Sequence, residues 1–113
     1  MCSRNTLDML LKETYTGLKN IFGEKLSNVI LYGSYARGDY DCESDIDVMA
    51  LVDIKKGELA KYRRIVSDFA SDIDLKYDVL LSIKLQDKFT FEKYGNALPY
   101  YMNVVREGVN IYV

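Results

Sequence analysis

The spacing of apolar positions predicts two amphipathic helices. The apolar positions of the first recur at steps of three and four and end near Gly23: Leu7, Leu10, Leu11, Thr14, Leu18 and Ile21. The second begins near Gly57, and its apolar positions follow the same steps through a charged background: Leu59, Tyr62, Val66, Phe69 and Ile73. Each helix therefore has one apolar stripe that can pack on a sheet.

Short apolar runs between these helices predict strands. Asn28–Tyr32 is rich in branched residues and stops at Gly33, which is typical of a buried strand. Residues 45–52 show the alternating pattern of a strand. Because successive side chains of a strand change faces, one face carries Asp45, Asp47, Met49 and Leu51 and the other carries Ile46, Val48, Ala50 and Val52.

The C-terminal half predicts two further strands and a helix. Lys76–Ser82 is a strand candidate with Asp78 near its start. Asn96 as N-cap and Pro99 in the first turn open a last helix, which Gly108 closes before a short strand from Val109 to Val113. The segment from Gln86 to Gly95 is compatible with a short helix or a loop.

The predicted order is α, β, β, α, β, α, β. It indicates an α+β (α/β) fold, with a small mixed sheet of about four strands and helices packed on it. A chain of 113 residues suits one hydrophobic core, so residues 1–113 are expected to form a single domain.

Composition and charge exclude several classes of function. The formal net charge of −2 argues against broad electrostatic binding to nucleic acid, and the basic pairs Lys55-Lys56 and Arg63-Arg64 are typical of solvated helix faces. No apolar run approaches the ~20 residues needed to span a bilayer. Charged residues interrupt the N-terminal apolar run, which argues against a signal peptide, so a cytoplasmic protein is expected.

Residue types narrow the chemistry further. The chain has no histidine, so zinc sites and histidine bases are disfavoured. Cys2 and Cys42 form no metal-ligand spacing, and acidic surroundings disfavour a reactive Cys42 thiolate. Any bound metal is therefore expected to have oxygen ligands.

The segment Tyr32–Val48, YGSYARGDYDCESDIDV, carries more chemistry than a connection needs. Asp45 and Asp47 share a strand face, where two carboxylates repel each other unless a cation lies between them. Aspartates without histidine favour magnesium or manganese. Gly33 allows close approach of a phosphate, to which the Ser34 hydroxyl and main-chain N–H groups can donate. Taken singly, these features are a turn and an acidic surface patch.

Gly33-Ser34 followed after ten residues by Asp45-Ile46-Asp47 resembles the signature of the DNA polymerase beta nucleotidyltransferase superfamily. The fuller forms Gly33-Ser34-Tyr35-Ala36-Arg37-Gly38 and Ser44-Asp45-Ile46-Asp47-Val48 resemble its minimal nucleotidyltransferase (MNT) branch. The resemblance continues more weakly through Asp78 to the ending Arg106-Glu107-Gly108-Val109.

This resemblance implies magnesium-dependent transfer of a nucleoside monophosphate from ATP or another nucleotide to a hydroxyl. By position, Gly33, Ser34 and Ser44 would contact the nucleotide, and Asp45 and Asp47 would be catalytic and bind two Mg²⁺ ions, with Mn²⁺ as a substitute. Asp78 would be the third catalytic carboxylate, which ligates the metal on the nucleophile side or accepts the proton of the nucleophile. Asp72 and Asp74 compete with Asp78 if the preceding helix ends earlier. Arg37 either contacts phosphate or pairs with Asp39, Asp41 or Glu43.

The resemblance also implies a partner. Larger superfamily members have a second helical domain, whereas the MNT branch is associated with an all-helical HEPN toxin, to whose tyrosine it adds AMP. Ten tyrosines, several of them near the C-terminus, suggest a partner surface: Tyr94, Tyr100, Tyr101 and Tyr112.

Other functions remain open at this level. A non-catalytic antitoxin would neutralise its partner by occlusion, and a small-molecule nucleotidyltransferase would need dimerisation to complete its substrate site. A sugar transferase using an Asp-x-Asp metal site usually needs a longer chain. The sequence does not decide between a monomer and a homo-oligomer.

Overall fold

The computed structural model describes residues 4–38, 45–94, 102, 104, 106 and 108–111. Its helices and strands, in chain order, are α1 (Arg4–Phe22), β1 (Leu26–Tyr32), α2 (Ser34–Arg37), β2 (Ile46–Val52), α3 (Ala60–Tyr77), β3 (Leu81–Asp87), α4 (Lys88–Tyr94) and β4 (Val109–Asn110). Short 3-10 turns at Gly23–Lys25 and Lys56–Glu58 precede β1 and α3. Both long helices therefore lie where the apolar spacing predicted them.

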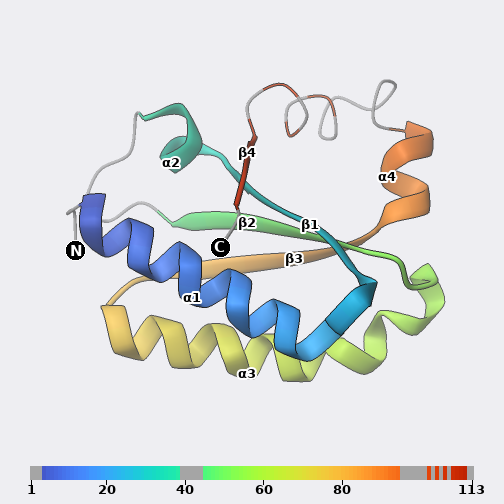
Figure 1. Cartoon of the computed structure of the whole chain (residues 1–113), viewed down its shortest axis with the longest axis horizontal. Coiled ribbons are helices and arrows are strands. Elements are labelled where there is room, and N and C mark those ends of the chain that lie inside the picture. Colours follow the sequence, from blue (N-terminus) through green and yellow to red (C-terminus); the bar gives the residue numbers. More distant parts are fainter. Residues whose placement is uncertain are drawn as a thin grey trace.

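The strands form one mixed sheet in the order β3-β2-β1-β4 (Figure 1). β1 pairs antiparallel with β2 and with β4, whereas β2 and β3 run parallel. α3 provides the long crossover that parallel neighbours require. The predicted α+β fold with about four mixed strands is confirmed.

The central strand β2 is buried on both faces over most of its length, and its residues alternate between the two faces as predicted. Ile46, Val48, Ala50 and Val52 belong to the core beneath α1 and α3. Met49 and Leu51 point the other way, into a smaller cluster with Ile30, Phe91 and Val104. The sheet therefore has helical residues on both faces. Figure 1 shows α2 and α4 at opposite ends of it.

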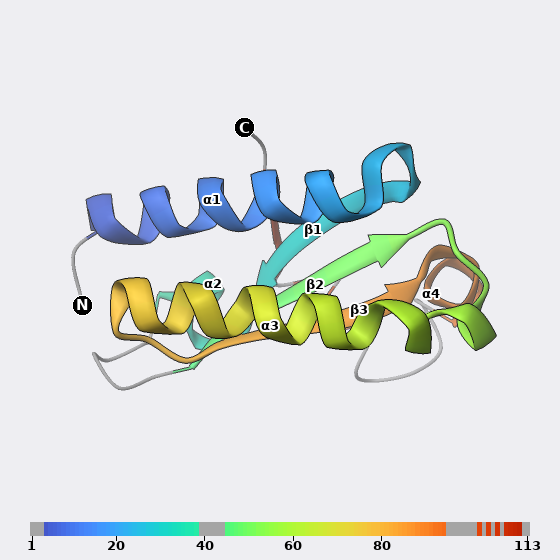
Figure 2. The ribbon, with the colours of Figure 1, turned by 90° about the horizontal axis from the view of Figure 1, so that it is seen from below.

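α1 and α3 run side by side in opposite directions on the first face (Figure 2). Their close approach depends on Gly17, because a Cβ added there would overlap the ring of Phe69. Further along, the rings of Phe22 and Tyr62 meet in a tilted arrangement with centroids 4.9 Å apart. The Phe69 ring of α3 thus fills the space left by Gly17 of α1.

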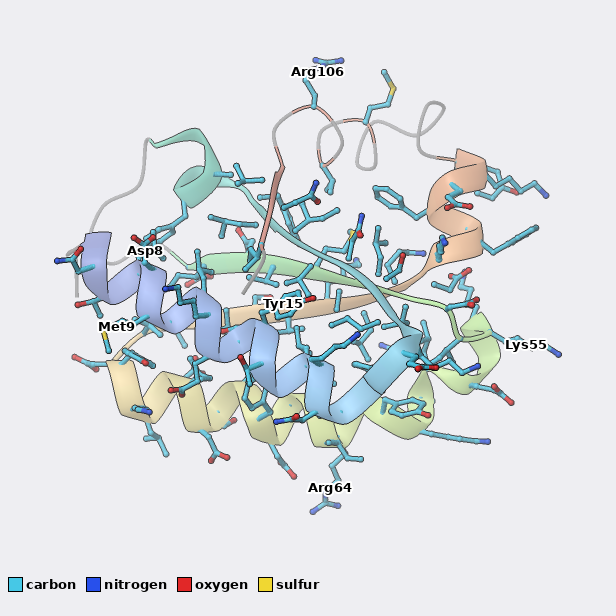
Figure 3. All side chains as sticks on the ribbon, viewed as in Figure 1. Asp8, Met9, Tyr15, Lys55, Arg64 and Arg106 are labelled. Carbon is cyan, nitrogen blue, oxygen red and sulfur yellow. The ribbon has the colours of Figure 1, made fainter. Side chains whose placement is uncertain are left out.

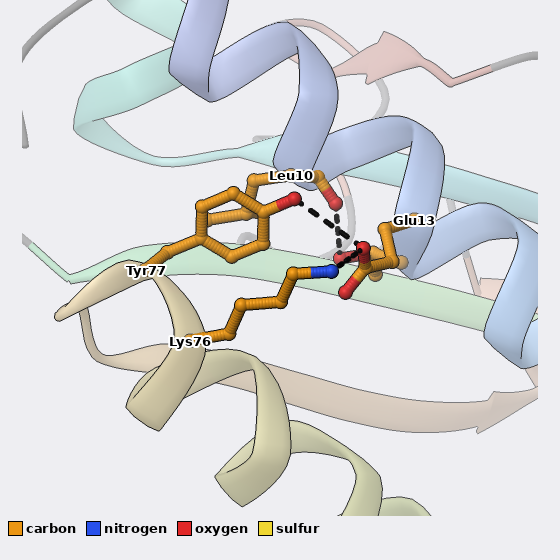
Figure 4. A network of polar contacts seen from close by, with 5 residues as sticks. Leu10, Glu13, Lys76 and Tyr77 are labelled. Carbon is orange, nitrogen blue, oxygen red and sulfur yellow. Dashed lines mark hydrogen bonds and ion pairs between the residues drawn. The ribbon is translucent and has the colours of Figure 1, made fainter.

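A polar network joins the same two helices (Figure 4). Lys76 Nζ lies 2.7 Å from Glu13 Oε1, and the Tyr77 hydroxyl donates to the same oxygen at 3.3 Å. Glu13 raises the pKa of Lys76 through this hydrogen bond and its charge. Beside it, the buried Thr14 hydroxyl donates to Leu10 O at 2.8 Å. This back-bond satisfies the one polar residue of the predicted apolar stripe.

The predicted strand Lys76–Ser82 is wrong in its bounds. α3 continues to Tyr77, Asp78 follows as its C-cap with φ 55° and ψ 55°, and β3 begins only at Leu81. The Val79 N–H donates to Asp74 O, and the Leu81 N–H donates to the Asp74 carboxylate at 2.7 Å. These bonds satisfy the end of the helix and the start of the strand, so the turn is placed between them.

In the segment from Gln86 to Gly95, which was compatible with a short helix or a loop, a short helix forms at Lys88–Tyr94, and Gly95 lies outside the described residues. Gln86 and Asp87 end β3, and α4 follows at once, with Asp87 Oδ2 accepting from the Thr90 N–H at 2.8 Å. Of the predicted last helix, Met102, Val104 and Arg106 are helical, and Asn96 and Pro99 lie outside the described residues. The Gly108 N–H donates to Val104 O at 2.8 Å. Strand β4 then begins at Val109 as predicted but ends at Asn110, before the predicted end, and Tyr112 and Val113 lie outside the described residues.

Candidate active site

The turn after β1 places a glycine beside a carboxylate. Gly33 has φ +78°, a conformation that side chains disfavour, and a Cβ added there would lie 2.6 Å from Asp47 Oδ2. The register of β1 and β2 explains this contact, because Tyr32 pairs with Asp47 and Gly33 comes next. Gly33 is therefore needed both for the turn and for the space that the Asp47 side chain occupies.

α2 begins directly after this turn. The Ala36 N–H donates to Gly33 O at 3.1 Å, and Tyr35 is buried in the core beneath α1. A short helix therefore follows Gly33 directly. Main-chain N–H groups in the first turn of a helix have no partner within the helix and are suited to donate to an anion.

Asp45 and Asp47 stand at the start of β2, next to this turn. Asp45 directly precedes the strand and is exposed, whereas Asp47 is half-buried. Burial raises the pKa of the Asp47 carboxyl above its usual value, and the negative charge of Asp45 raises it further. Ionising both carboxyl groups is therefore unfavourable unless a positive charge lies close to them.

This pair fits a divalent cation. It consists of hard oxygen donors, one of them partly desolvated, whose mutual repulsion a cation would relieve. Among the described residues, no group of three or more acidic or cysteine side chains could hold a metal. Water and substrate oxygens are suitable further ligands for a metal held by Asp45 and Asp47.

The row across the sheet at Asp47 contains two residues that the sequence did not single out. Ser82 of β3 pairs with Asp47, and Lys84 pairs with Met49, two residues further along each strand. Residues level with each other on neighbouring strands share a face. Tyr32, Asp47, Ser82 and Lys84 therefore lie on the same face. The alternation of SIKLQ could have indicated this, but the misplaced strand concealed it.

The structure does not place Asp78 on β3. Asp78 is exposed and comes three residues before the strand, in the turn that closes α3. Because β2 and β3 are parallel and Ile46 pairs with Leu81, this turn lies at the end of the sheet where Asp45 stands. Of its competitors, Asp74 is occupied by the Leu81 N–H, and Asp72 is exposed on α3. The expectation that a carboxylate from the neighbouring strand joins the pair is not met by β3 itself.

Other predicted residues are placed only in part. Ser34 and Arg37 are the first and last residues of α2, but their side chains are not among those described. Ser44 and both cysteines lie outside the described residues, as do Tyr100, Tyr101 and Tyr112. Tyr94 is exposed on α4. The roles predicted for these residues stay predictions.

The chain is similar to known nucleotidyltransferases. Residues 11–101 match the nucleotidyltransferase domain family. Two relatives from Methanocaldococcus jannaschii bear the names "Putative protein adenylyltransferase MJ0141" and "Putative protein adenylyltransferase MJ0604". The first is 47% identical over 65% of this chain and 72% of its own, and the second is 33% identical over 90% and 94%. The chain therefore belongs to the nucleotidyltransferase family and is an enzyme of that class.

The fold of this chain is also similar to a solved structure. A chain in the "Crystal structure of the toxin-antitoxin with AMP-PNP" superposes with a TM-score of 0.60 at 18% identity, over 90% of this chain and 72% of that one. At such low identity the similarity concerns the fold. The match of residues 11–101 confirms the resemblance of the Gly-Ser and Asp-x-Asp signature at the level of the nucleotidyltransferase family. None of the described helices is long and apolar enough to cross a membrane.

Proposed function

We propose that this protein is an MNT-type adenylyltransferase that moves AMP from ATP to a tyrosine hydroxyl of a HEPN ribonuclease toxin, and so acts as its antitoxin. The observation that carries the chemistry is the packing of the half-buried Asp47 carboxylate against Gly33, with Asp45 beside it. The names of the two adenylyltransferase relatives and the toxin–antitoxin context of the structural neighbour support the choice of acceptor.

In this reaction the acceptor oxygen forms a bond to the α-phosphorus of ATP. The bond from that phosphorus to the bridging oxygen breaks, pyrophosphate leaves, and the acceptor loses its proton. Asp45 and Asp47 are the residues that would hold Mg²⁺, with Mn²⁺ as a substitute. When bound, the metal neutralises phosphate charge and stabilises the attacking and leaving oxygens.

The chain's own groups position the nucleotide. We assign the main chain of Gly33 as a contact for the triphosphate, because its positive φ turns the chain from the end of β1 into α2 beside Asp47. We assign the Ser34 hydroxyl and the first N–H groups of α2 as donors to it, with Ser44 and Arg37 as further contacts. Ser82, level with Asp47, would border the same space.

We assign Asp78 as the third carboxylate, acting near the acceptor. Its place in the turn before β3, at the Asp45 end of the sheet, supports this assignment. Its exposure leaves it accessible to an incoming protein. Asp78 would then accept the acceptor proton or hold the acceptor hydroxyl in line.

The test is intact mass spectrometry of a HEPN partner incubated with ATP and Mg²⁺. Wild-type protein is expected to add one AMP unit or a multiple of it, whereas Asp45→Asn with Asp47→Asn adds none. Substituting Asp53, an exposed aspartate just after β2, by Asn is the matched control and is expected to retain full transfer. A stable complex without any added mass would instead favour inhibition by occlusion.

The proposed setting follows from the substrates. ATP and Mg²⁺ are abundant in the cytoplasm, where a ribonuclease toxin would meet its RNA. The partner would complete the closed site. Purification of the complex from cytoplasmic extract is the corresponding observation.

A further inference from the structure

β3 lies at one edge of the sheet, since the strand order is β3-β2-β1-β4. The Ile46 N–H donates to Leu80 O, and in a parallel ladder alternate residues of a strand bond to the same neighbour. The main-chain groups of Ser82, Lys84 and Gln86 therefore face β2. Those of Ile83 and Leu85 are directed outward, away from the sheet. This outer edge can accept another extended strand.

An open groove of about 690 Å³ runs along this edge between β3 and α3. Its α3 wall includes the small residues Ser67 and Ala70, which leave room beside the strand. The opposite wall is β3 itself, from Leu81 to Asp87. The groove is therefore as long as the strand and gives access to the outward main-chain groups.

The groove is basic although the chain as a whole carries a net charge of −2. Lys56 and Arg63 line the wall opposite β3, and no ion pair joins either of them to the residues that the structure describes. Lys84 lies on β3, on the face that also carries Asp47. The acidic residue in the lining, Asp87, is buried, and its carboxylate accepts from Gln86 Nε2 and the Thr90 N–H. The charge available to a ligand is thus positive, which selects an acidic segment.

The groove also leads to the carboxylates. Ser82, at one end of the lining, pairs with Asp47 across the sheet. A chain laid along the edge from Asp87 towards Ser82 would therefore bring its end to the level of Asp47. We propose that an extended acidic segment of the protein substrate pairs with the outer edge of β3 and delivers the acceptor hydroxyl to the site. This inference rests on the proposed function and identifies the surface that the acceptor protein uses.

A lysine on an edge strand is also a common device against aggregation. That role and the proposed one make different demands. Protection from aggregation needs only Lys84 and predicts no binding of an acidic strand, whereas docking also uses Lys56 and Arg63 on the far side of the groove. The experiment below separates them.

The probe is an eight-residue peptide that alternates Glu and Val and ends in Tyr, titrated into ¹⁵N-labelled protein without ATP or metal. Its counterpart replaces each Glu with Lys. The acidic peptide is expected to shift the amide resonances of β3 and of the neighbouring α3 wall, and to slow hydrogen exchange at Ile83 and Leu85. The lysine peptide is expected to leave them unchanged.

The chain offers matched controls on each side of the groove. Arg63→Glu is expected to lower the affinity for the acidic peptide roughly tenfold, about 1.4 kcal/mol, whereas Arg64→Glu is expected to leave this affinity unchanged. Lys56→Glu and Lys55→Glu form a second pair with the same expectation. Neither Arg64 nor Lys55 lines the groove, and Figure 3 shows both side chains extending outward from the molecule.

The proposal would be overturned if the two peptides bound equally well, or if the resonance shifts lay away from β3. Equal losses of affinity for the acidic peptide in Arg63→Glu and Arg64→Glu would also overturn it. So would concentration-dependent shifts at β3 with a doubled mass and no peptide, because a second copy would then occupy the edge. Peptide binding needs neither ATP nor transfer. Intact binding without AMP transfer would therefore contradict the proposed function alone.

Discussion

The Asp47 carboxylate occupies the space that a side chain on residue 33 would need, since a Cβ at Gly33 would lie 2.6 Å from Asp47 Oδ2. The glycine of the Gly-Ser turn and the second aspartate of the Asp-x-Asp pair are thus one packing unit. Substituting either one disturbs the other.

Gly33→Ala is expected to destabilise the protein by about 2–3 kcal/mol, because it combines a left-handed φ with a steric overlap. It should also abolish transfer by displacing Asp47. Gly23→Ala is the control: Gly23 also has a positive φ, but a Cβ there meets nothing within 4 Å. Its expected cost is about 1 kcal/mol with transfer retained. Equal losses of stability in denaturant titrations would show that the overlap with Asp47 is unimportant.

The sequence predicted the parts of this site that are local in the chain. Alternation placed Asp45 and Asp47 at the start of a strand, and Gly33 marked the end of the preceding one. The contact between Gly33 and Asp47 could not be predicted, because it depends on the register of β1 and β2. Register is set by cross-strand packing, which a single sequence does not display.

β3 shows where pattern reasoning failed. Helix α3 keeps its period past Ile73 to Tyr77, so the sequence KYDVLLS mixes the end of a helix, a left-handed cap and the first residues of a strand. The deciding bond, from the Leu81 N–H to the Asp74 carboxylate, joins residues whose spacing has no periodic signal. Ser82 and Lys84 were missed for the same reason.

The raised pKa of Asp47 has a consequence for stability. When folding raises a carboxyl pKa, the stability that this group contributes is present below the unfolded pKa and is lost as pH rises through the folded pKa. Ionised Asp47 therefore destabilises the metal-free protein at neutral pH. Asp47→Asn is expected to raise the melting temperature at pH 7 in EDTA, and this gain should vanish as the pH falls below about 4.

Mg²⁺ should reverse the order of the melting temperatures of the wild type and Asp47→Asn. Millimolar Mg²⁺ is expected to raise the melting temperature of the wild type but not of Asp47→Asn, because only a state that binds metal is stabilised by it. Asp53→Asn is the control and should respond to Mg²⁺ like the wild type. A lower melting temperature for Asp47→Asn in EDTA at pH 7 would contradict the desolvation argument.

Asp78 allows structural and catalytic roles to be separated. Its left-handed conformation suits glycine, so Asp78→Gly is expected to stabilise the protein by about 0.5–1 kcal/mol. If Asp78 acts on the acceptor, Asp78→Gly and Asp78→Asn should both slow single-turnover transfer at least roughly tenfold with nucleotide affinity unchanged. Asp72→Asn on the exposed side of α3 is the control. Full transfer by the stabilised Asp78→Gly protein would remove Asp78 from the mechanism.

Gly17 tests the packing that holds α1 on α3. Alanine favours a helix over glycine by about 1 kcal/mol, whereas forcing a methyl group into a filled space costs about 1–3 kcal/mol. Because the added Cβ would overlap the Phe69 ring, the steric cost should exceed the gain, and Gly17→Ala is expected to lower the free energy of unfolding by about 1–2 kcal/mol. Phe69→Leu should restore part of this loss in the double variant, since the smaller side chain vacates the space. An increased free energy of unfolding for Gly17→Ala alone would show that the two helices separate at little cost.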